Sequence, residues 1–306
     1  MIPGTKALPS LEEAARAAEA IGYPVMLKAC AGGGGRGIRL IRSADELEEN
    51  WNQATAEARS AFGDSSMYLE KYISPARHVE LQILADEQGN AVCLGERDCS
   101  LQRRNQKLIE ETPSPAVNEV QRAHVIALAV DAVKKIGYVG AGTLEFFLDT
   151  AGNFWFMEMN VRLQVEHCVT EMLTGIDLVK WQIRIAAGIA LSFTQEDVSL
   201  TGSAIECRIN AASCGTLKLL HVPGGPSVRF DTSLIAGAQI TPYYDSLLGK
   251  LIVYAKTREQ TLRKLRAALC ELVIDGISTN IEEQLGILDD DRFTSGNYDL
   301  TFMGSR

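Results

Sequence analysis

The sequence is short of several features that would assign it to a particular class of protein. It has no apolar run near the roughly 20 residues that a membrane helix needs. The opening residues Met1 to Thr5 contain no basic start and no apolar stretch, which predicts that no signal peptide is present. Repeats and low-complexity tracts are also missing. We therefore expect a cytoplasmic protein.

Cysteine and positive charge are limited as well. The seven cysteines include no CxxC pair and match no zinc spacing. Because their number is odd and they are scattered along the chain, we expect them to be reduced thiols. The formal net charge of −9 argues against nucleic acid as a general partner. With 306 residues, 46% of them hydrophobic, the chain is large enough for two domains with buried cores.

The hydrophobic pattern predicts mixed helices and strands. Capping residues and closing glycines predict helices over residues 11–21, 43–62, 118–136 and 176–187. Strand patterns occupy 24–29, 36–41, 78–85, 90–96, 143–148 and 153–160. After residue 202 strand-like runs dominate (204–209, 227–230 and 250–254), before a helix over 258–272. This mixture predicts an α+β layered fold with a second, smaller domain.

Residues 144–160 form a predicted hairpin that brings two carboxylates together. With the turn near Ala151, Glu145 faces Glu158, and Asn160 lies on the same face two residues later. Like charges opposite each other repel, so they need a counter-ion, and hard oxygen ligands suit magnesium. The alternative is a pair of solvated surface glutamates. The apolar neighbours of the hairpin favour the metal site.

Residues 32–37 are glycine-rich and join two strand patterns. Glycines let backbone N–H groups approach phosphate oxygens, and Lys28 precedes them on a strand. The run is neither a Walker motif nor a dinucleotide fingerprint. A flexible hairpin loop is the alternative.

Two further segments carry charge in a suggestive spacing. Residues 96–111 hold four cations, which either bind anions or form a surface laced with salt bridges. In residues 160–170 an extended chain places Arg162, Gln164 and Glu166 on one face with the carboxylate cluster. A cation, an amide and a carboxylate beside a metal suit binding and deprotonation of a small anion. His167 then points away and serves as a structural hydrogen bonder.

Together these segments resemble the biotin carboxylase family of ATP-grasp enzymes. The resemblance implies an ATP-grasp domain over residues 1–195, with a mobile lid at about 30–90, and a mainly-β biotin carboxylase C-terminal domain over 202–303. The stretches that carry it, in the family's order, are KACAGGGGRGIRL, YLEKYISPARHVELQILAD, ERDCSLQRRNQKLIEE, GAGTLEFFLD, FMEMNVRLQVEHCVTEMLTGIDLV, AIECRINA, PYYDSLLGKLIVYA and VIDGISTNI.

The resemblance also implies roles for residues at matching positions. Glu145, Glu158 and Asn160 are expected to hold Mg²⁺ or Mn²⁺. Bicarbonate is expected to bind Lys107, Arg162, Gln164 and the backbone N–H of Val165, with Glu166 as general base and Arg208 stabilising the biotin enolate. The residues expected at ATP are Lys28, Gly33, Gly34, Gly35, Glu70, Lys71, Ile73, His78, Gln102 and Asn105.

The implied reaction is carboxylation of biotin. Glu166 deprotonates bicarbonate, which attacks the γ-phosphate of ATP to give carboxyphosphate, and CO₂ from that intermediate adds to biotin. A lid keeps water out. Implied partners are a biotin carboxyl carrier protein and carboxyltransferase subunits, with a possible homodimer. ERDCSLQRRNQK and IECRINA are most similar to the subunit of acetyl-CoA carboxylase, which implies a role in fatty-acid synthesis; propionyl-CoA, methylcrotonyl-CoA and pyruvate carboxylases are the alternatives.

The chain departs from the family pattern in four places. The family's first domain, roughly a hundred residues, is not represented. Residues 210–223 are shorter than usual, Cys168 replaces the usual Pro or Thr, and Ser203 replaces the common His. Two alternative functions therefore remain: another ATP-grasp ligase, against which the Arg162–Glu166 segment argues, and a nucleotide-binding module without catalysis.

Overall fold

The computed structural model describes residues 1–32 and 37–305, which divide into two compact units. The first unit comprises Met1–Ser74 with Trp155–Met157, and the second comprises Pro75–Phe154 with Glu158–Arg306. Gly33, Gly34 and Gly35, which the sequence predicts at phosphate, lie outside the described residues. Within the described ranges, no helix combines the length and the apolar character that crossing a membrane requires.

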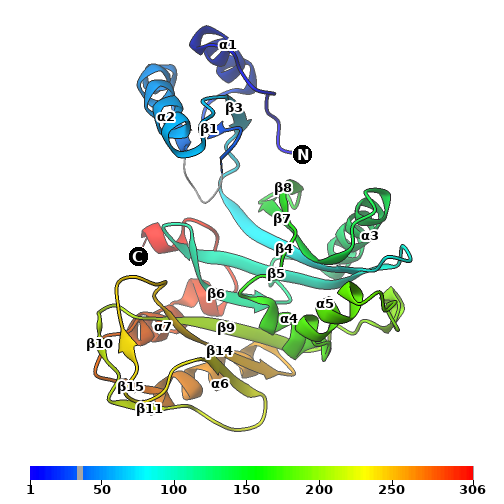
Figure 1. The fold of residues 1–306 in the computed structure, drawn as a ribbon, viewed down its shortest axis with the longest axis vertical. Helices are drawn as coiled ribbons and strands as arrows, with labels where there is room; N and C mark the ends of the chain where they lie inside the picture. Colours follow the sequence, from blue (N-terminus) through cyan, green and yellow to red (C-terminus); the bar gives the residue numbers. More distant parts are fainter. Residues whose placement is uncertain (33–36, 306) are drawn as a thin grey trace. The chain divides into compact units, whose positions relative to one another are not determined.

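The first unit is a small antiparallel sheet with two helices packed on it. The strand order is β2-β1-β3, and β1 alternates buried and half-buried residues, so one face carries the core. Ser10 caps α1 by accepting from the Glu13 N–H, and Gly22 ends the helix with a φ of 83°. The elements are α1 (Leu11–Ile21), β1 (Val25–Ala29), β2 (Ile38–Ile41), η1 (Ala44–Glu46), α2 (Leu47–Phe62) and β3 (Met67–Lys71) (Figure 1).

The second unit is built on an eight-stranded sheet with the order β12-β14-β9-β6-β5-β4-β7-β8. Pairing of β6 with β9 joins the strands before and after residue 200 into one sheet. The pairs with a printed register are all antiparallel. Its strands are β4 (Ala76–Ala85), β5 (Ala91–Arg103), β6 (Gln106–Thr112), β7 (Gly140–Asp149), β8 (Phe154–Asn160), β9 (Ser203–Asn210), β12 (Val228–Thr232) and β14 (Leu247–Ala255).

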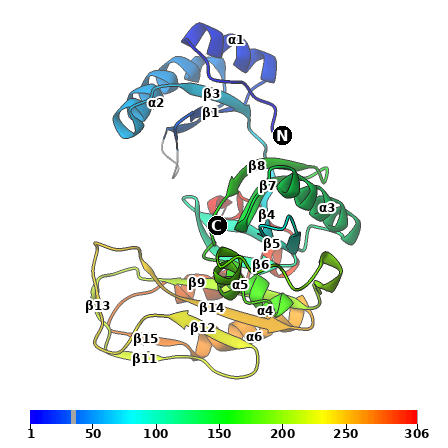
Figure 2. The same ribbon diagram turned by 45° about the vertical axis from the view of Figure 1, so that its right-hand side comes forward.

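Helices cover both faces of the β9–β14 part of this sheet. Ala204 and Ile252 pack against α4, whereas the alternate positions Ile205 and Leu251 join the core that includes α6. Both views draw α4 and α6 on opposite sides of these strands (Figure 1, Figure 2). The remaining elements are α3 (Glu119–Lys135), α4 (His167–Thr174), α5 (Leu178–Ala186), η2 (Gln195–Asp197), β10 (Gly215–Thr216), β11 (Leu219–His221), β13 (Gln239–Ile240), α6 (Arg258–Glu271), β15 (Val273–Asp275), α7 (Ile281–Leu288), α8 (Asp291–Thr294) and η3 (Phe302–Ser305).

The predicted mixture of helices and strands is confirmed, with corrections. The helices expected near residues 11–21 and 118–136 form as α1 and α3, each with the predicted cap. The sequence patterns did not indicate β3, β6 or α4. β4 lies between β5 and β7 and is buried along its whole length. The domain boundaries stay a prediction.

Leu251 tests the core of the second unit. It lies on β14, is fully buried and belongs to the cluster that α6 covers. Leu251→Ala removes buried contacts and leaves a cavity, so we expect the free energy of unfolding to fall by about 2–5 kcal/mol. Urea unfolding followed by circular dichroism measures this loss. Leu219→Ala, at a residue that is 53% exposed, is the control. An equal loss in both variants would contradict this description of the core.

Candidate functional site

Two carboxylates and an amide meet where β7 and β8 are neighbours in the sheet. Asn160 Nδ2 donates to Glu145 Oε1 at 2.9 Å and to Glu158 Oε1 at 3.2 Å. Glu145 is buried and Glu158 is exposed. The three predicted side chains therefore converge, and an oxygen-rich set of this kind fits a hard divalent cation. Their role in holding a metal stays a prediction.

Glu145 is also linked to residues expected at the nucleotide. His78 Nε2 lies 3.0 Å from Glu145 Oε2, and Gln102 Nε2 lies 2.8 Å from His78 Nδ1. Burial, the largest influence, would raise the pKa of Glu145, but the hydrogen bond from His78 and the charges of His78 and Lys107 lower it below its ordinary value. Glu145 is therefore held as a carboxylate.

Glu166 is a buried carboxylate with one cation at each oxygen. Lys107 Nζ donates to Oε1 at 2.5 Å, and Arg208 Nη2 donates to Oε2 at 2.9 Å. Only 1% of Glu166 is exposed, so these contacts replace the water that an ionised carboxylate requires. The structure thus brings three residues predicted to be catalytic into direct contact.

Gln164, two residues before Glu166 in the chain, contacts the first cluster. Its Nε2 donates to Glu145 Oε1 at 3.0 Å, and Arg162 Nη1 donates to Gln164 Oε1 at 2.7 Å. The expectation that residues 162–166 are extended is wrong: they turn, and Glu166 precedes the first residue of α4. The side chains converge through this turn instead of through strand alternation.

The remaining residues predicted at ATP fall in two places. The first unit, which is treated separately from the second, contains Lys28, Glu70, Lys71 and Ile73. There Lys28 Nζ lies 2.5 Å from Glu70 Oε2, and Lys71 Nζ donates to the carbonyl oxygen of Gly22 at 2.7 Å. Asn105 is exposed in the turn between β5 and β6, with a φ of 65°.

Arg97 and Glu80 belong to the same network, and the sequence analysis missed them. Arg97 Nε donates to Glu80 Oε1 at 2.6 Å, and Lys107 Nζ donates to Glu80 Oε2 at 2.8 Å. Arg97 is fully buried, so the interpretation of its segment as a salt-bridged surface is wrong at this residue. Burial opposes ionisation of Glu80, but Lys107 and Arg97 lower its pKa to about 2. The sequence feature that could have indicated this buried pair is the glutamate inside the apolar pattern of β4.

Glu110 and Glu206 form a second pair of residues that sequence reasoning missed. They lie directly opposite each other on β6 and β9, and both are fully buried. Arg208 Nε donates to Glu110 Oε1 at 2.6 Å, while among the described residues both oxygens of Glu206 lack a hydrogen-bond partner. Burial raises the pKa of Glu110 to about 7 and that of Glu206 well above its ordinary value. Burial thus disfavours the ionised form of Glu206.

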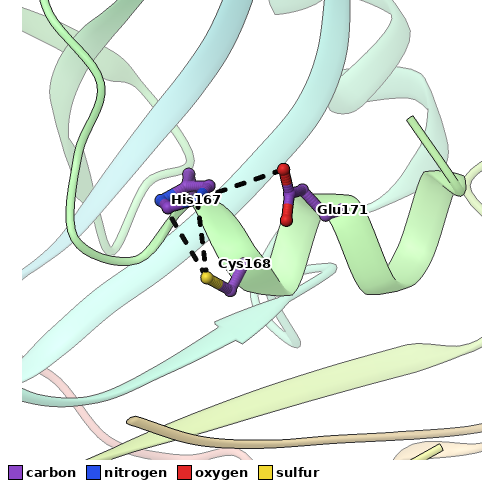
Figure 3. Close-up of side chains that lie close together, drawn as sticks. All are labelled: His167, Cys168 and Glu171. Carbon is purple, nitrogen blue, oxygen red and sulfur yellow. Dashed lines mark hydrogen bonds and ion pairs between the residues drawn. The ribbon is translucent and has the colours of Figure 1, made fainter. Parts of the chain in front are cut away.

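His167, Cys168 and Glu171 gather at the start of α4, as Figure 3 shows. These are residue types that bind transition metals, and His167 Nε2 lies 3.6 Å from Cys168 Sγ. However, Lys250 Nζ donates to Cys168 Sγ at 2.8 Å, and Arg229 Nη1 donates to Glu171 at 2.7 Å. Two side-chain cations already form hydrogen bonds with this cluster, so we assign no metal to it.

Two family descriptions match the chain. Residues 1–194 match "Carbamoyl-phosphate synthase L chain, ATP binding domain", and residues 206–305 match "Biotin carboxylase C-terminal domain".

Curated relatives match nearly the whole chain. The biotin carboxylase of Haemophilus influenzae is 50% identical over 94% of this chain and 65% of its own length. The 2-oxoglutarate carboxylase small subunit of Hydrogenobacter thermophilus is 49% identical over 99% of this chain and 66% of its own length. Biotin carboxylase 1 of Bacillus subtilis is 49% identical over 99% of this chain and 70% of its own length. The chain thus spans slightly less than two thirds of the first two relatives.

Solved structures agree with these matches. The biotin carboxylase domain dimer of Hydrogenobacter thermophilus 2-oxoglutarate carboxylase, in complex with MgADP, ADP and bicarbonate, has a TM-score of 0.96 and 49% identity, covering all of this chain and 69% of that one. The biotin carboxylase–βγ-ATP complex from Campylobacter jejuni has a TM-score of 0.97 and 44% identity. The match covers 100% of this chain and 70% of that one.

Glu110 predicts a specific pH dependence of stability. Its pKa is about 7 in the folded protein, above the ordinary value of an unfolded glutamate, so its contribution to stability is full at low pH and is lost as pH rises towards and through 7. Glu110→Gln removes this titration. From pH 5 to pH 8 we expect the variant to gain on the order of 2 kcal/mol of unfolding free energy relative to the wild type.

Urea unfolding at both pH values measures this difference. Glu259→Gln, at a glutamate whose side chain is 75% exposed, is the control and should follow the wild type. A difference between Glu110→Gln and the wild type that does not change with pH would show that Glu110 is not protonated in this range.

Proposed function

This chain belongs to the biotin carboxylase family of ATP-grasp enzymes, and we propose that it catalyses the ATP- and bicarbonate-dependent carboxylation of biotin on a carrier protein. The observation that carries the proposal is Glu166, a buried carboxylate held by Lys107 and Arg208, with Lys107 Nζ also lying 3.8 Å from Glu145 Oε1 of the acidic cluster. A base, an anion-binding segment and an acidic cluster in one network suit activation of a small oxyanion beside a nucleotide phosphate.

Glu166 is the proposed general base for bicarbonate. The anion is oriented by Lys107, Arg162, Gln164 and the N–H of Val165, so that its oxygen attacks the γ-phosphate of ATP and gives carboxyphosphate, with ADP as the leaving group. Lys107 and Arg208 both donate to the carboxylate of Glu166 and so hold it in place. Carboxyphosphate decays to CO₂ and phosphate, the phosphate takes the N1 proton of biotin, and Arg208 stabilises the resulting enolate, to which CO₂ adds.

The acidic cluster is the proposed magnesium site. Glu145, Glu158 and Asn160 are oxygen-bearing side chains that already meet at one amide, which fits the ligand preference of Mg²⁺ or Mn²⁺. When bound, the ion offsets negative charge on the phosphates. The proposed nucleotide contacts are Lys28, Gly33, Gly34, Gly35, Glu70, Lys71, Ile73, His78, Gln102 and Asn105.

The final acceptor is proposed from the sequence stretches near the site. ERDCSLQRRNQK and IECRINA support a role in acetyl-CoA carboxylase and fatty-acid synthesis in the cytoplasm, with a biotin carboxyl carrier protein, carboxyltransferase subunits and a second copy of the chain as partners. The 49% identity to a 2-oxoglutarate carboxylase small subunit supports a keto acid as the alternative acceptor. Mass spectrometry of the acceptor carboxylated by the reconstituted complex distinguishes them.

Phosphate release from ATP tests the proposed reaction. We expect hydrolysis to require bicarbonate and to rise with free biotin, and Glu166→Gln to reduce that rate by about 10²–10⁴-fold because the base is lost. Glu259→Gln, on the exposed side of α6, should leave the rate unchanged. ATP binding by the wild type without hydrolysis under any condition would support a nucleotide-binding module instead.

Nucleotide binding tests the metal site independently of turnover. In Glu158→Gln one ligand loses its charge, so we expect the Mg²⁺ concentration that half-saturates ATP binding to rise by about tenfold or more. Calorimetric titration of ATP at several Mg²⁺ concentrations measures the change. Asp131→Asn, at an exposed residue of α3, should match the wild type. An unchanged Mg²⁺ requirement in Glu158→Gln would remove this residue from the site.

A further inference from the structure

Lys250 is a buried cation placed directly behind the segment that carries the proposed base. It lies on β14, opposite Arg208 on β9, so the two side chains are neighbours on one face of the sheet. Ala204 and Ile252 on that face pack against Cys168 and Val169 of α4. Lys250 therefore projects towards the first turn of α4 and the residues just before it.

The ammonium group of Lys250 has specific partners there. Nζ donates to the Val165 carbonyl at 2.7 Å and to Cys168 Sγ at 2.8 Å, and lies 3.9 Å from Asp231 Oδ2. Its side chain is 12% exposed. Burial would lower the pKa of Lys250, but Glu206, Cys168 and Asp231 raise it above its ordinary value, so the group stays charged. A charged donor makes a stronger hydrogen bond to a carbonyl than a neutral one.

The bond to Val165 acts on the backbone of the site. The peptide unit is planar, so a fixed Val165 carbonyl also fixes the direction of the Glu166 N–H and the position of its Cα. Arg208 holds the same residue by its carboxylate, at 2.9 Å. Two adjacent cations on neighbouring strands thus hold Glu166, one through the main chain and one through the side chain.

His167 holds the preceding peptide in the same way. Its Nδ1 lies 2.8 Å from the Gln164 carbonyl, and that peptide carries the Val165 N–H proposed to bind bicarbonate. Burial and the charge of Lys250 lower the pKa of His167, which favours a neutral ring with its proton on Nδ1. Lys250 therefore influences both peptides, one directly and one through the charge state of His167.

We propose that Lys250 is a positioning residue that fixes the Val165–Glu166 peptide and thereby sets the affinity of this segment for bicarbonate. The proposal rests on the proposed function, because it assigns bicarbonate to residues 162–166. Among the described residues, Lys250 bonds the main-chain carbonyl of Val165 and none of the side chains assigned to bicarbonate. It acts from behind the segment, through the backbone.

A second lysine gives a matched control. Lys264 on α6 donates to the carbonyls of Tyr254 at 2.8 Å and Pro226 at 3.0 Å, so it also holds backbone carbonyls in the second unit. It has no contact with residues 162–168 among the hydrogen bonds of the described chain. If Lys250 had only a structural role, Lys250→Met and Lys264→Met would behave alike.

The experiment combines hydrogen exchange with kinetics on the full chain. In Lys250→Met we expect amide exchange in residues 162–168 to accelerate by about tenfold or more, because local opening becomes easier. We expect KM for bicarbonate to rise by about 10–100-fold, as when other supporting contacts of a site are removed, with KM for ATP within about twofold. Lys264→Met should change neither quantity. If Lys250→Met does not fold, Lys250→Gln, which keeps a neutral donor, is measured instead and should show intermediate effects.

The two readouts separate failure of this proposal from failure of the proposed function. A wild type without bicarbonate-dependent hydrolysis contradicts the function, while exchange in residues 162–168 still reports the effect of Lys250. Exchange that is unchanged in the Lys250 variants, or accelerated equally in Lys264→Met, overturns the positioning role. Faster exchange with an unchanged KM for bicarbonate in an active enzyme also overturns it.

Discussion

Burial of the Glu166 carboxylate imposes a constraint on the whole second unit, because an ionised group without water must be paired. Lys107 and Arg208 pair it, but they are largely buried too and need partners of their own. Glu80 pairs Lys107, Glu110 bonds Arg208, and Arg97 pairs the second oxygen of Glu80. The result is a row of alternating acidic and basic groups in which removing one member leaves its neighbour without a partner. Such networks respond strongly to single substitutions.

The order of the strands follows from this row. Glu80 lies on β4, Arg97 on β5, Lys107 and Glu110 on β6, and Arg208 on β9, and these four strands are consecutive in the sheet. The charges therefore run across the strands, and β6–β9 pairing brings Arg208 beside Glu110. Strands before and after residue 200 must belong to one sheet for Glu166 to receive both cations.

Sequence reasoning reached the parts of the site that are local in the chain. Glu145, Glu158 and Asn160 lie on adjacent strands joined by a short turn, so alternation alone predicts their convergence. Residues 162–166 were placed near the cluster for the wrong reason, because no alternation signal marks the turn into α4. Functional roles came from the family resemblance, since spacing does not distinguish a base from a structural carboxylate.

Arg97, Glu110 and Glu206 were not predictable because their partners are distant in sequence. Arg97 contacts Glu80 and Thr170, so its burial depends on strand pairing and on the docking of α4. The opposition of Glu110 and Glu206 depends on the β6–β9 register, which joins residues about a hundred positions apart. A charged residue in an apolar strand indicates a buried partner, but the sequence alone does not identify that partner.

The buried carboxyl group of Glu206 lies close enough to Lys250 and Arg208 to interact with their charges. If Glu206 were ionised, it would share the positive charge of Lys250 and Arg208, and Glu166 would hold its two cations against a nearby buried anion. Burial raises the pKa of Glu206 and so opposes this competition, which favours the bonds of Arg208 to Glu166 and of Lys250 to the Val165 carbonyl. Both oxygens of Glu206 lack a hydrogen-bond partner among the described residues, whereas Arg208 and Lys250 bond the 162–166 segment.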